Sequence, residues 1–224
     1  MSTASSQYWE QSDQFGHAIA YLLLLMSLVS WTLILAKMWS FWRVRNAAPT
    51  IRSFWLAPGI DDALALLRRA DREKVFLSLA HAAVQVTSHQ HRLATLSVDS
   101  DISDVLTRSL RQELQAATTR LENGLTVLAS VGATAPFVGL LGTVWGIYHA
   151  LTSISASGMV QIDQLAGPVG EALIMTALGL MVAIPAVLAF NAFNRINRIT
   201  LAELDGFAHD LHAHFCRLHH NHAV

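Results

Sequence analysis

The chain carries little charge and almost no cysteine. Of its 224 residues, 53% are hydrophobic and only 14% are charged, against roughly 25% charged residues in a typical soluble domain. The single cysteine, Cys216, excludes a disulfide framework within one chain. Neither residues 1–17 nor residues 152–166 contain a Lys or an Arg. This composition predicts an integral membrane protein and argues against a soluble one.

Three uncharged runs are long enough to cross a bilayer as helices. They cover residues 18–36, 125–154 and 172–194. Each exceeds the roughly 18 to 20 residues that a helix needs to span about 30 Å of hydrocarbon. No basic residue precedes the first run, and Lys37 follows it where a cleavage site would have small residues. We therefore expect this run to stay in the mature protein and not to be removed as a signal peptide.

The basic residues predict how the three spans are oriented. Twelve of the fifteen Lys and Arg residues lie between Lys37 and Arg120, and the other three follow the last run. By the positive-inside rule, the N-terminus is outside and the C-terminus is cytoplasmic. The predicted fold is an all-α integral membrane protein with three transmembrane helices (N-out, C-in) and long helices extending into a cytoplasmic helical domain. The expected segments are an outside N-terminus (1–17), a first transmembrane helix (18–40), a cytoplasmic helical insert (41–124), a second transmembrane helix (125–151), an outside loop (152–163), a third transmembrane helix (164–194) and a cytoplasmic His-rich tail (195–224).

The insert is expected to be helical throughout. Pro58 and Gly59 mark a turn, after which a short helix begins with acidic residues and ends with Arg68 and Arg69, matching the helix dipole. Residues 75–86 form a second amphipathic stretch. The polar residues 99–104 indicate a break that caps the next helix.

A hydrophobic stripe then leads into the second span. Its members recur at steps of three and four residues: Leu106, Leu110, Leu114, Ala117 and Leu121. Because no Pro or Gly interrupts this stretch before Gly124, we expect one long helix that leaves the membrane and projects into the cytoplasm. The stripe either packs on neighbouring subunits or is buried within its own chain, and periodicity supports both equally.

Small residues line one face of the second and third spans. In the second span they are Gly132, Gly139, Gly142 and Gly146, and in the third they are Ala172, Thr176, Gly179, Ala183 and Ala186. Helices in lipid associate by close backbone approach, so we expect these faces to pack against other helices and the chain to form a homo-oligomer. Pro136 and Pro185 also lie within the spans. They either kink the helices beside a polar cavity or belong to plain transmembrane packing.

Glu171 is the candidate functional residue. A carboxylate at the bilayer centre costs roughly 2.5 to 3.5 kcal/mol on insertion scales, so a span that only anchors a chain has no use for it. If the helix begins near Asp163, Glu171 lies two turns inside it, and Thr143 and Thr176 are the hydroxyls suited to keep its surroundings polar. If the helix begins at residues 167–170, Glu171 lies in the first turn at the headgroup level. The residues alone support both alternatives about equally.

The C-terminal segment is rich in histidine. His209, His212 and His214 could meet a metal ion, since short His-rich tracts can bind zinc or nickel. No cluster of Cys or carboxylate residues completes a recognisable ligand set, so a solvated tail without a metal site is the favoured interpretation.

Four segments of the last two spans resemble a known family. Residues 135–147 read APFVGLLGTVWGI, residues 170–173 read GEAL, and two further segments read TALGL (176–180) and AIPAV (183–187). They closely resemble the ExbB/TolQ branch of the MotA/TolQ/ExbB proton-channel family, most of all ExbB. The resemblance covers residues 126–194, and the order of three spans with a large first cytoplasmic insert agrees with it.

The resemblance implies a proton-driven motor. Such proteins form a homo-oligomeric ring, a pentamer, in the inner membrane of Gram-negative bacteria. The outside in the orientation above would then be the periplasm. The ring encloses ExbD-like single-span subunits and drives a TonB-like protein, which energises outer-membrane uptake of siderophores and cobalamin. Glu171 would be a buried carboxylate facing the pore, with Thr143 and Thr176 lining the polar path, while an Asp of the partner carries the proton. The implied partners are copies of the chain, the two other proteins and the lipid bilayer, with no nucleic acid, no cofactor and no enzymatic activity.

Other functions remain open. A TolQ-like subunit would use the same motor to drive outer-membrane constriction at division, and the shared motifs do not separate the two roles. A MotA-like flagellar stator is disfavoured, because that relative usually has four spans. A passive membrane scaffold, whose small-residue faces only assemble other proteins, belongs to a different class.

Overall fold

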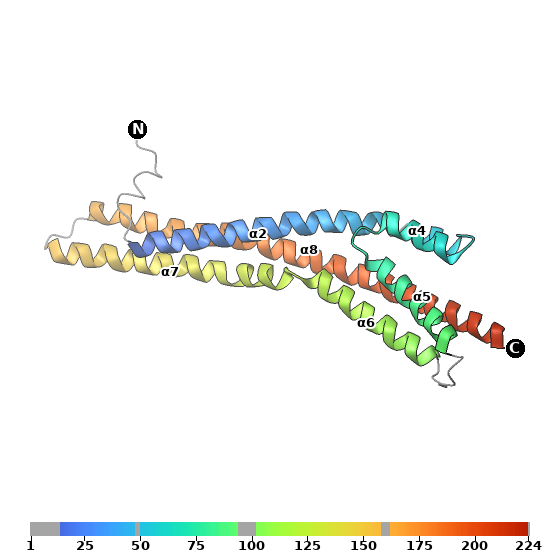
Figure 1. The fold of residues 1–224 in the computed structure, drawn as a ribbon. Helices are drawn as coiled ribbons and strands as arrows, with labels where there is room; N and C mark the ends of the chain where they lie inside the picture. The colour runs from blue at the N-terminus through green and yellow to red at the C-terminus, as the bar shows by residue number, and fades with distance from the viewer. Residues whose placement is uncertain (1–13, 48–49, 94–101, 158–161, 224) are drawn as a thin grey trace. The chain divides into compact units, whose positions relative to one another are not determined.

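The computed structural model describes residues 14–47, 50–93, 102–157 and 162–223, and those residues form helices joined by turns (Figure 1). The expected all-α fold is confirmed in these ranges. Residues 1–13 of the expected N-terminal segment and residues 99–101 of the expected polar break lie outside them. The helices are α2 (Gln14–Ala47), α3 (Thr50–Trp55), α4 (Ile60–Ala70), α5 (Val75–Leu93), α6 (Ile102–Glu122), α7 (Leu125–Ser157) and α8 (Ile162–Ala223).

The chain forms two compact units. The first comprises Met1–Leu35 with Gly124–Phe193, and the second comprises Ala36–Asn123 with Asn194–Val224. Helices α2 and α8 each contribute residues to both units.

The first unit consists of α7 and the apolar parts of α2 and α8. Among the residues that the structure describes, three helices are long and apolar enough to cross a membrane, within Gln14–Val44, Ile102–Thr152 and Val169–Arg217. Much of their apolar surface is uncovered: Phe137 is 70% exposed and Met181 is 68% exposed. Such a surface requires lipid or other helices to cover it.

The core of the first unit is small. In Figure 1, α2, α7 and the first part of α8 run alongside one another. Buried apolar side chains from all three helices meet between them: Ile19, Leu23, Ala135, Met175 and Ala183. Small side chains in this core bring the helix backbones close together, which is the usual way in which helices associate in lipid.

The second unit has a larger apolar core. Phe76 and Leu79 of α5, Leu106 of α6, and Leu204 and Leu211 of α8 are 0% exposed and belong to one cluster. The predicted stripe of α6 belongs to the same cluster, with Leu110 and Ala117 buried and Leu114 and Leu121 partly buried. Of the two alternatives for this stripe, burial within its own chain is therefore the one that the structure supports.

The short helices of the insert match the sequence pattern. The expected turn at Pro58 and Gly59 separates α3 from α4, and Asp61, Asp62, Arg68 and Arg69 occupy the two ends of α4. The second amphipathic stretch is α5, which continues to Leu93.

The prediction of one long helix from the α6 stripe into the second span was wrong. Helix α6 ends at Glu122 and α7 begins at Leu125. Between them, Gly124 has a φ angle of 82°, a left-handed conformation that glycine adopts without steric penalty and that commonly ends a helix. At the end of α6, the Leu121 carbonyl accepts hydrogen bonds from Lys37 Nζ at 2.7 Å and from Asn197 Nδ2 at 2.6 Å. These two side chains satisfy a carbonyl that has no partner within its helix.

The interpretation of residues 195–224 as a solvated tail was also wrong for the residues that the structure describes. Helix α8 continues to Ala223, and three aromatic or aliphatic side chains from this stretch, Phe207, Leu211 and Phe215, are buried in the core of the second unit. Their spacing of four residues places them on one helix face.

Candidate functional site

The backbones of α7 and α8 touch at Gly139 and Gly179. A Cβ atom added at Gly139 would lie 2.6 Å from the Met175 carbonyl oxygen and 3.1 Å from the Gly179 Cα. A Cβ atom added at Gly179 would lie 2.6 Å from the Ala135 carbonyl oxygen. Because backbone atoms cannot move aside as a flexible side chain can, only glycine fits at either position.

The other predicted glycines of α7 also face neighbouring helices. An added Cβ at Gly146 would lie 3.0 Å from the Ala172 Cβ, and one at Gly132 would lie 2.5 Å from the Val187 Cγ2. At Gly142 it would meet both Met175 of α8 and Ile19 of α2, at 3.1 and 3.2 Å. The glycine face identified in the sequence is thus the face along which α7 meets its neighbours within the chain.

Both prolines lie inside continuous helices. Pro136 lies in α7 and Pro185 lies in α8. Proline has no N–H, so each removes one backbone hydrogen bond of its helix. Pro136 follows Ala135, whose carbonyl oxygen faces Gly179, so this proline lies next to the closest contact of the two helices.

Two hydroxyl groups meet between α7 and α8. The Thr143 side chain, which is 6% exposed, lies with its Oγ1 3.1 Å from the Gly139 carbonyl oxygen and 3.2 Å from the Ala172 carbonyl oxygen, and it is hydrogen-bonded to Thr176 Oγ1. A hydroxyl group has one proton to donate and can accept others. Thr143 can thus donate to a carbonyl oxygen while it accepts the proton of Thr176, and these contacts order two polar side chains in an otherwise apolar helix pair.

Glu171 lies on α8, one residue before Ala172. Helix α8 begins at Ile162, so Glu171 is more than two turns inside it, and the alternative that placed Glu171 in the first turn was wrong. Ala172, whose carbonyl oxygen Thr143 contacts, is the next residue. The Glu171 side chain is partly buried, and it has neither a hydrogen bond nor an ion pair with any other residue that the structure describes. In particular, no hydrogen bond links it to Thr143 or Thr176.

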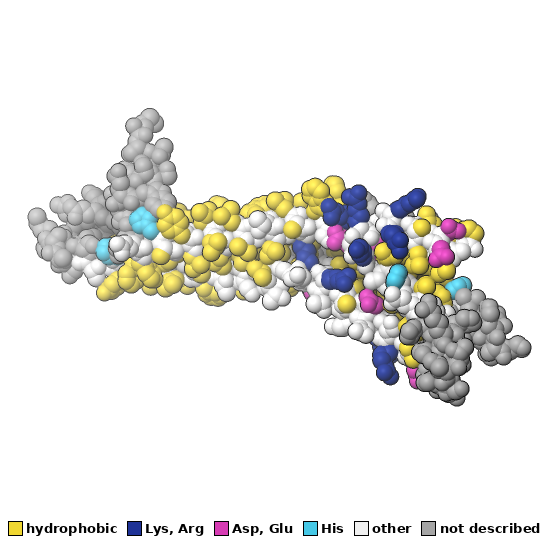
Figure 2. Space-filling model, in the orientation of Figure 1, with side chains coloured by type: hydrophobic (Ala, Val, Ile, Leu, Met, Phe, Trp, Pro, Cys, Tyr) yellow, Lys and Arg dark blue, Asp and Glu magenta, His cyan; other side chains and the backbone are white. Residues whose placement is uncertain are grey.

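Few charged residues surround Glu171 in its unit. Within residues 14–35 and 124–193, the sequence contains only Asp163 and Glu171 as charged residues. On the face of the molecule shown in Figure 2, hydrophobic side chains cover the helices of this unit, while Lys, Arg, Asp and Glu lie on the second unit. An acid in such an environment has no protein cation to neutralise it, so it requires water, a proton or a group from another chain.

The three predicted histidines enter the packing of the second unit to different degrees. His212 Nε2 lies 3.2 Å from Ser103 Oγ and 3.7 Å from Cys216 Sγ, and the His214 ring lies 5.5 Å from that of Trp55. His209 is exposed. Among the side chains that the structure describes, no group of three or more His, Cys, Asp or Glu is arranged to hold a metal ion.

Sequence patterns missed two contributors to this site. One is the Ala172 carbonyl oxygen, because a backbone atom leaves no signature in residue identity. The other is Ile19 of α2, which lies against Gly142 of α7 and packs with Met175 of α8, so that α2 is the third helix at this contact. The predicted residues Thr143, Thr176, Gly139 and Gly179 are brought together, whereas Glu171 lies beside them without a direct bond.

Comparison with known proteins assigns the chain to a family. Residues 72–205, more than half of the chain, match the MotA/TolQ/ExbB proton channel family. The chain belongs to this family. It is 46% identical over 198 residues to the biopolymer transport protein ExbB of Xanthomonas campestris pv. campestris, covering 86% of this chain and 78% of that protein. It is 40% identical over 207 residues to the ExbB protein of Neisseria meningitidis, covering 91% of this chain and 93% of that protein.

Another branch of the MotA/TolQ/ExbB family matches a shorter stretch. The Tol-Pal system protein TolQ of Pseudomonas aeruginosa is 36% identical over 117 residues, which is 52% of this chain and 51% of that protein. The family is one of proton channels, which indicates a transport function.

Proposed function

We propose that this chain is an ExbB-like subunit of a motor driven by the proton-motive force. With an ExbD-like single-span partner it energises a TonB-like protein, and through it the outer-membrane uptake of siderophores and cobalamin. The proposal rests above all on one observation: Glu171 has no hydrogen bond or ion pair with any residue that the structure describes, and it lies in a helix pair that is otherwise almost uncharged.

The similarity to relatives favours the ExbB role over the TolQ role. The two ExbB proteins match 86% and 91% of this chain, whereas the TolQ protein of Pseudomonas aeruginosa matches 52% of it. The match to these two ExbB proteins includes the insert as well as the last two spans, which supports an ExbB-like role.

The proposed assembly follows from the surfaces and charges of the chain. Copies form a ring, a pentamer by family resemblance, in the inner membrane of a Gram-negative bacterium, with the N-terminus in the periplasm and the C-terminus in the cytoplasm. The exposed apolar faces of α2, α7 and α8 are covered by lipid and by other copies. All Lys and Arg residues lie in the second unit, which supports a cytoplasmic location for that unit.

In the proposed mechanism, Glu171 faces a pore and exchanges or orients protons that an Asp of the partner carries. Thr143 and Thr176 keep the path beside it polar, since their hydroxyls can donate and accept in turn. Moving one charge across 100 mV is worth roughly 2.3 kcal/mol. That free energy is enough to bias a movement of one subunit relative to another. The proposed motor therefore needs no covalent chemistry to supply energy.

The test is replacement of Glu171 in the native host. Strains carrying Glu171→Gln are grown on a ferric siderophore as the only iron source, and the partner protein is co-purified from the same membranes. We expect growth to be lost while the complex still assembles, because Gln has nearly the shape of Glu but cannot release a proton. Glu203→Gln, on the exposed face of α8 in the second unit, is the matched control and should grow normally.

Two outcomes would contradict the proposal. Normal growth and normal division of the Glu171→Gln strain, with the complex assembled, would leave only the passive scaffold. Normal siderophore-dependent growth together with a defect in outer-membrane constriction at division would assign the chain to the TolQ role.

A further inference from the structure

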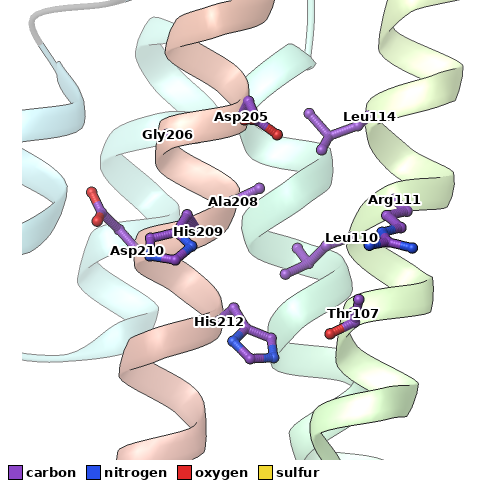
Figure 3. A pocket seen from close by; sticks show the side chains of 10 residues that line it. All are labelled: Thr107, Leu110, Arg111, Leu114, Asp205, Gly206, Ala208, His209, Asp210 and His212. Carbon is purple, nitrogen blue, oxygen red and sulfur yellow. The ribbon is translucent and has the colours of Figure 1, made fainter.

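A groove with charged edges runs between α6 and α8 in the second unit. It has a volume of about 610 Å³ (Figure 3). Leu110 and Leu114 of α6 line it together with Gly206 of α8, and its edges carry Arg111 from α6 and Asp205 from α8. Its apolar lining and charged edges are the features of a site that another helix can occupy.

The charges on the two sides of the groove have opposite sign. On α6, the exposed residue Arg111 is basic, and on α8 the exposed residues Asp205 and Asp210 are acidic. None of these three side chains forms an ion pair with a residue that the structure describes. Opposite charges on the two sides of one groove match a partner surface that carries both signs.

The register of the two helices places these charges at matching heights. Ser103 Oγ of α6 lies 3.2 Å from His212 Nε2 of α8, and the Leu121 carbonyl oxygen accepts a hydrogen bond from Asn197. The two helices are therefore antiparallel. Interpolation between these two contacts places Arg111 level with Asp205.

Gly206 supplies a second, independent observation. It lies inside α8, where glycine costs about 1 kcal/mol relative to alanine. A Cβ atom added there would meet nothing within 4 Å, so the packing of this chain does not require glycine. A glycine whose surroundings are empty within its own chain allows the backbone of a second helix to approach.

We propose that this groove binds α6 of a second copy of the chain, so that Arg111 of one copy pairs with Asp205 of the next across Gly206. The inference rests on the ring of the proposed function and names the surface that closes it. Neighbouring copies in a ring are related by rotation about an axis, taken here as parallel to the helices, and this rotation does not change the position of a residue along that axis. Arg111 of one copy is therefore level with Asp205 of the next, as it is within one chain. A contact between two different surfaces, repeated by such a rotation, closes into a ring.

Cross-linking between two differently tagged chains tests this contact. Both chains carry Cys216→Ser, one also carries Arg111→Cys and the other Asp205→Cys, and they are produced together in the native membrane and treated with a short bismaleimide. Because each chain has one cysteine, only a contact between chains can join the two tags. The control replaces Asp205→Cys by Asp61→Cys, an equally exposed acid on α4.

We expect a product carrying both tags with the Asp205→Cys chain and none with the Asp61→Cys chain. Gly206→Trp, whose Cβ atom would meet nothing within 4 Å in a single chain, should remove most of that product by occupying the groove. The native mass of the wild-type complex in detergent distinguishes failure of this contact from failure of the proposed ring. An oligomer that gives no doubly tagged product, or in which the Asp205→Cys chain is joined only to another protein, overturns this contact alone. A monomer overturns the proposed ring as well.

Discussion

Asp71 illustrates how much one side chain can organise in this protein. It is 1% exposed, and its Oδ2 accepts hydrogen bonds from the backbone N–H groups of Phe76 at 2.7 Å and Leu77 at 2.9 Å, at the start of α5. Its own backbone N–H donates to the Leu67 carbonyl oxygen at 2.7 Å and so closes the end of α4. One residue therefore ends one helix and begins the next.

Replacing Asp71 is expected to loosen the connection between α4 and α5. Asp71→Ala leaves the buried Phe76 N–H and the partly buried Leu77 N–H without their acceptor, and an unsatisfied buried group costs roughly 1 to 3 kcal/mol. We expect faster trypsin cleavage at Arg72 and Lys74, which lie in this connection, and a lower unfolding temperature of the detergent-solubilised protein. Asp71→Asn retains an acceptor oxygen and should lose less.

The control for this prediction is Asp61→Ala, which removes an exposed acid from the first turn of α4. Equal cleavage rates for Asp71→Ala and Asp61→Ala would show that the two hydrogen bonds to α5 do not hold the connection.

At this scale the sequence predicted some residues and not others. Glu171, Thr143 and Thr176 could be singled out because an acid or a hydroxyl is unusual in an apolar run. Asp71 is one of several acids in a polar loop, and only its burial distinguishes it. The sequence shows that a polar residue is unusual when the residues next to it along the chain are apolar. It does not show that a polar residue is buried by residues from other parts of the chain.

The contact between α7 and α8 is the feature to test at the scale of elements. Gly139→Ala is expected to force the two helices apart, since the added methyl group would overlap the Met175 carbonyl oxygen. Overpacking of this kind typically costs about 1 to 3 kcal/mol. The unfolding temperature of the purified protein should fall, and less of the complex should be recovered from membranes.

Gly170→Ala is the matched control on α8, because nothing lies within 4 Å of the added Cβ atom. If Gly139→Ala and Gly170→Ala had the same unfolding temperature, close approach at Gly139 would not be needed.

The elements that were predicted wrongly share a physical cause. The apolar stripe of α6 continues in register toward α7, and nothing in its periodicity reveals that Gly124 takes a positive φ angle. In α8, histidines and acids conceal the stripe of Phe207, Leu211 and Phe215 that holds it in the core. Helix ends and buried faces of mixed segments depend on tertiary partners, which periodicity does not contain.

The orientation of the whole molecule can be tested with impermeant thiol reagents. In a Cys216→Ser background, we expect Thr152→Cys to be labelled in intact spheroplasts, because it lies near the end of α7, where the segment predicted to be outside (152–163) begins. Arg217→Cys should be labelled only after the membrane is opened, because basic residues remain on the cytoplasmic side. Both positions are exposed in the chain, so accessibility of the side chain itself does not limit the reaction.

Labelling of Arg217→Cys in intact spheroplasts, with Thr152→Cys protected, would reverse the orientation. In that case the second unit would face the periplasm.

For the molecule as a whole, the three apolar runs and the family resemblance were sufficient to predict an all-helical chain with three helices able to cross a membrane, and the family itself. The division into two units was not predicted in its details. It depends on where α2 and α8 exchange one set of neighbours for another, at Leu35 and Phe193, and no break in either helix marks these places.

The touching backbones at Gly139 and Gly179 limit how a motor of this kind can work. Two helices whose backbones are in direct contact, without flexible side chains between them, cannot easily slide or rotate relative to each other. The α7 and α8 segments of the first unit therefore form one rigid pair. In the motor that we propose, any movement would take place between separate chains.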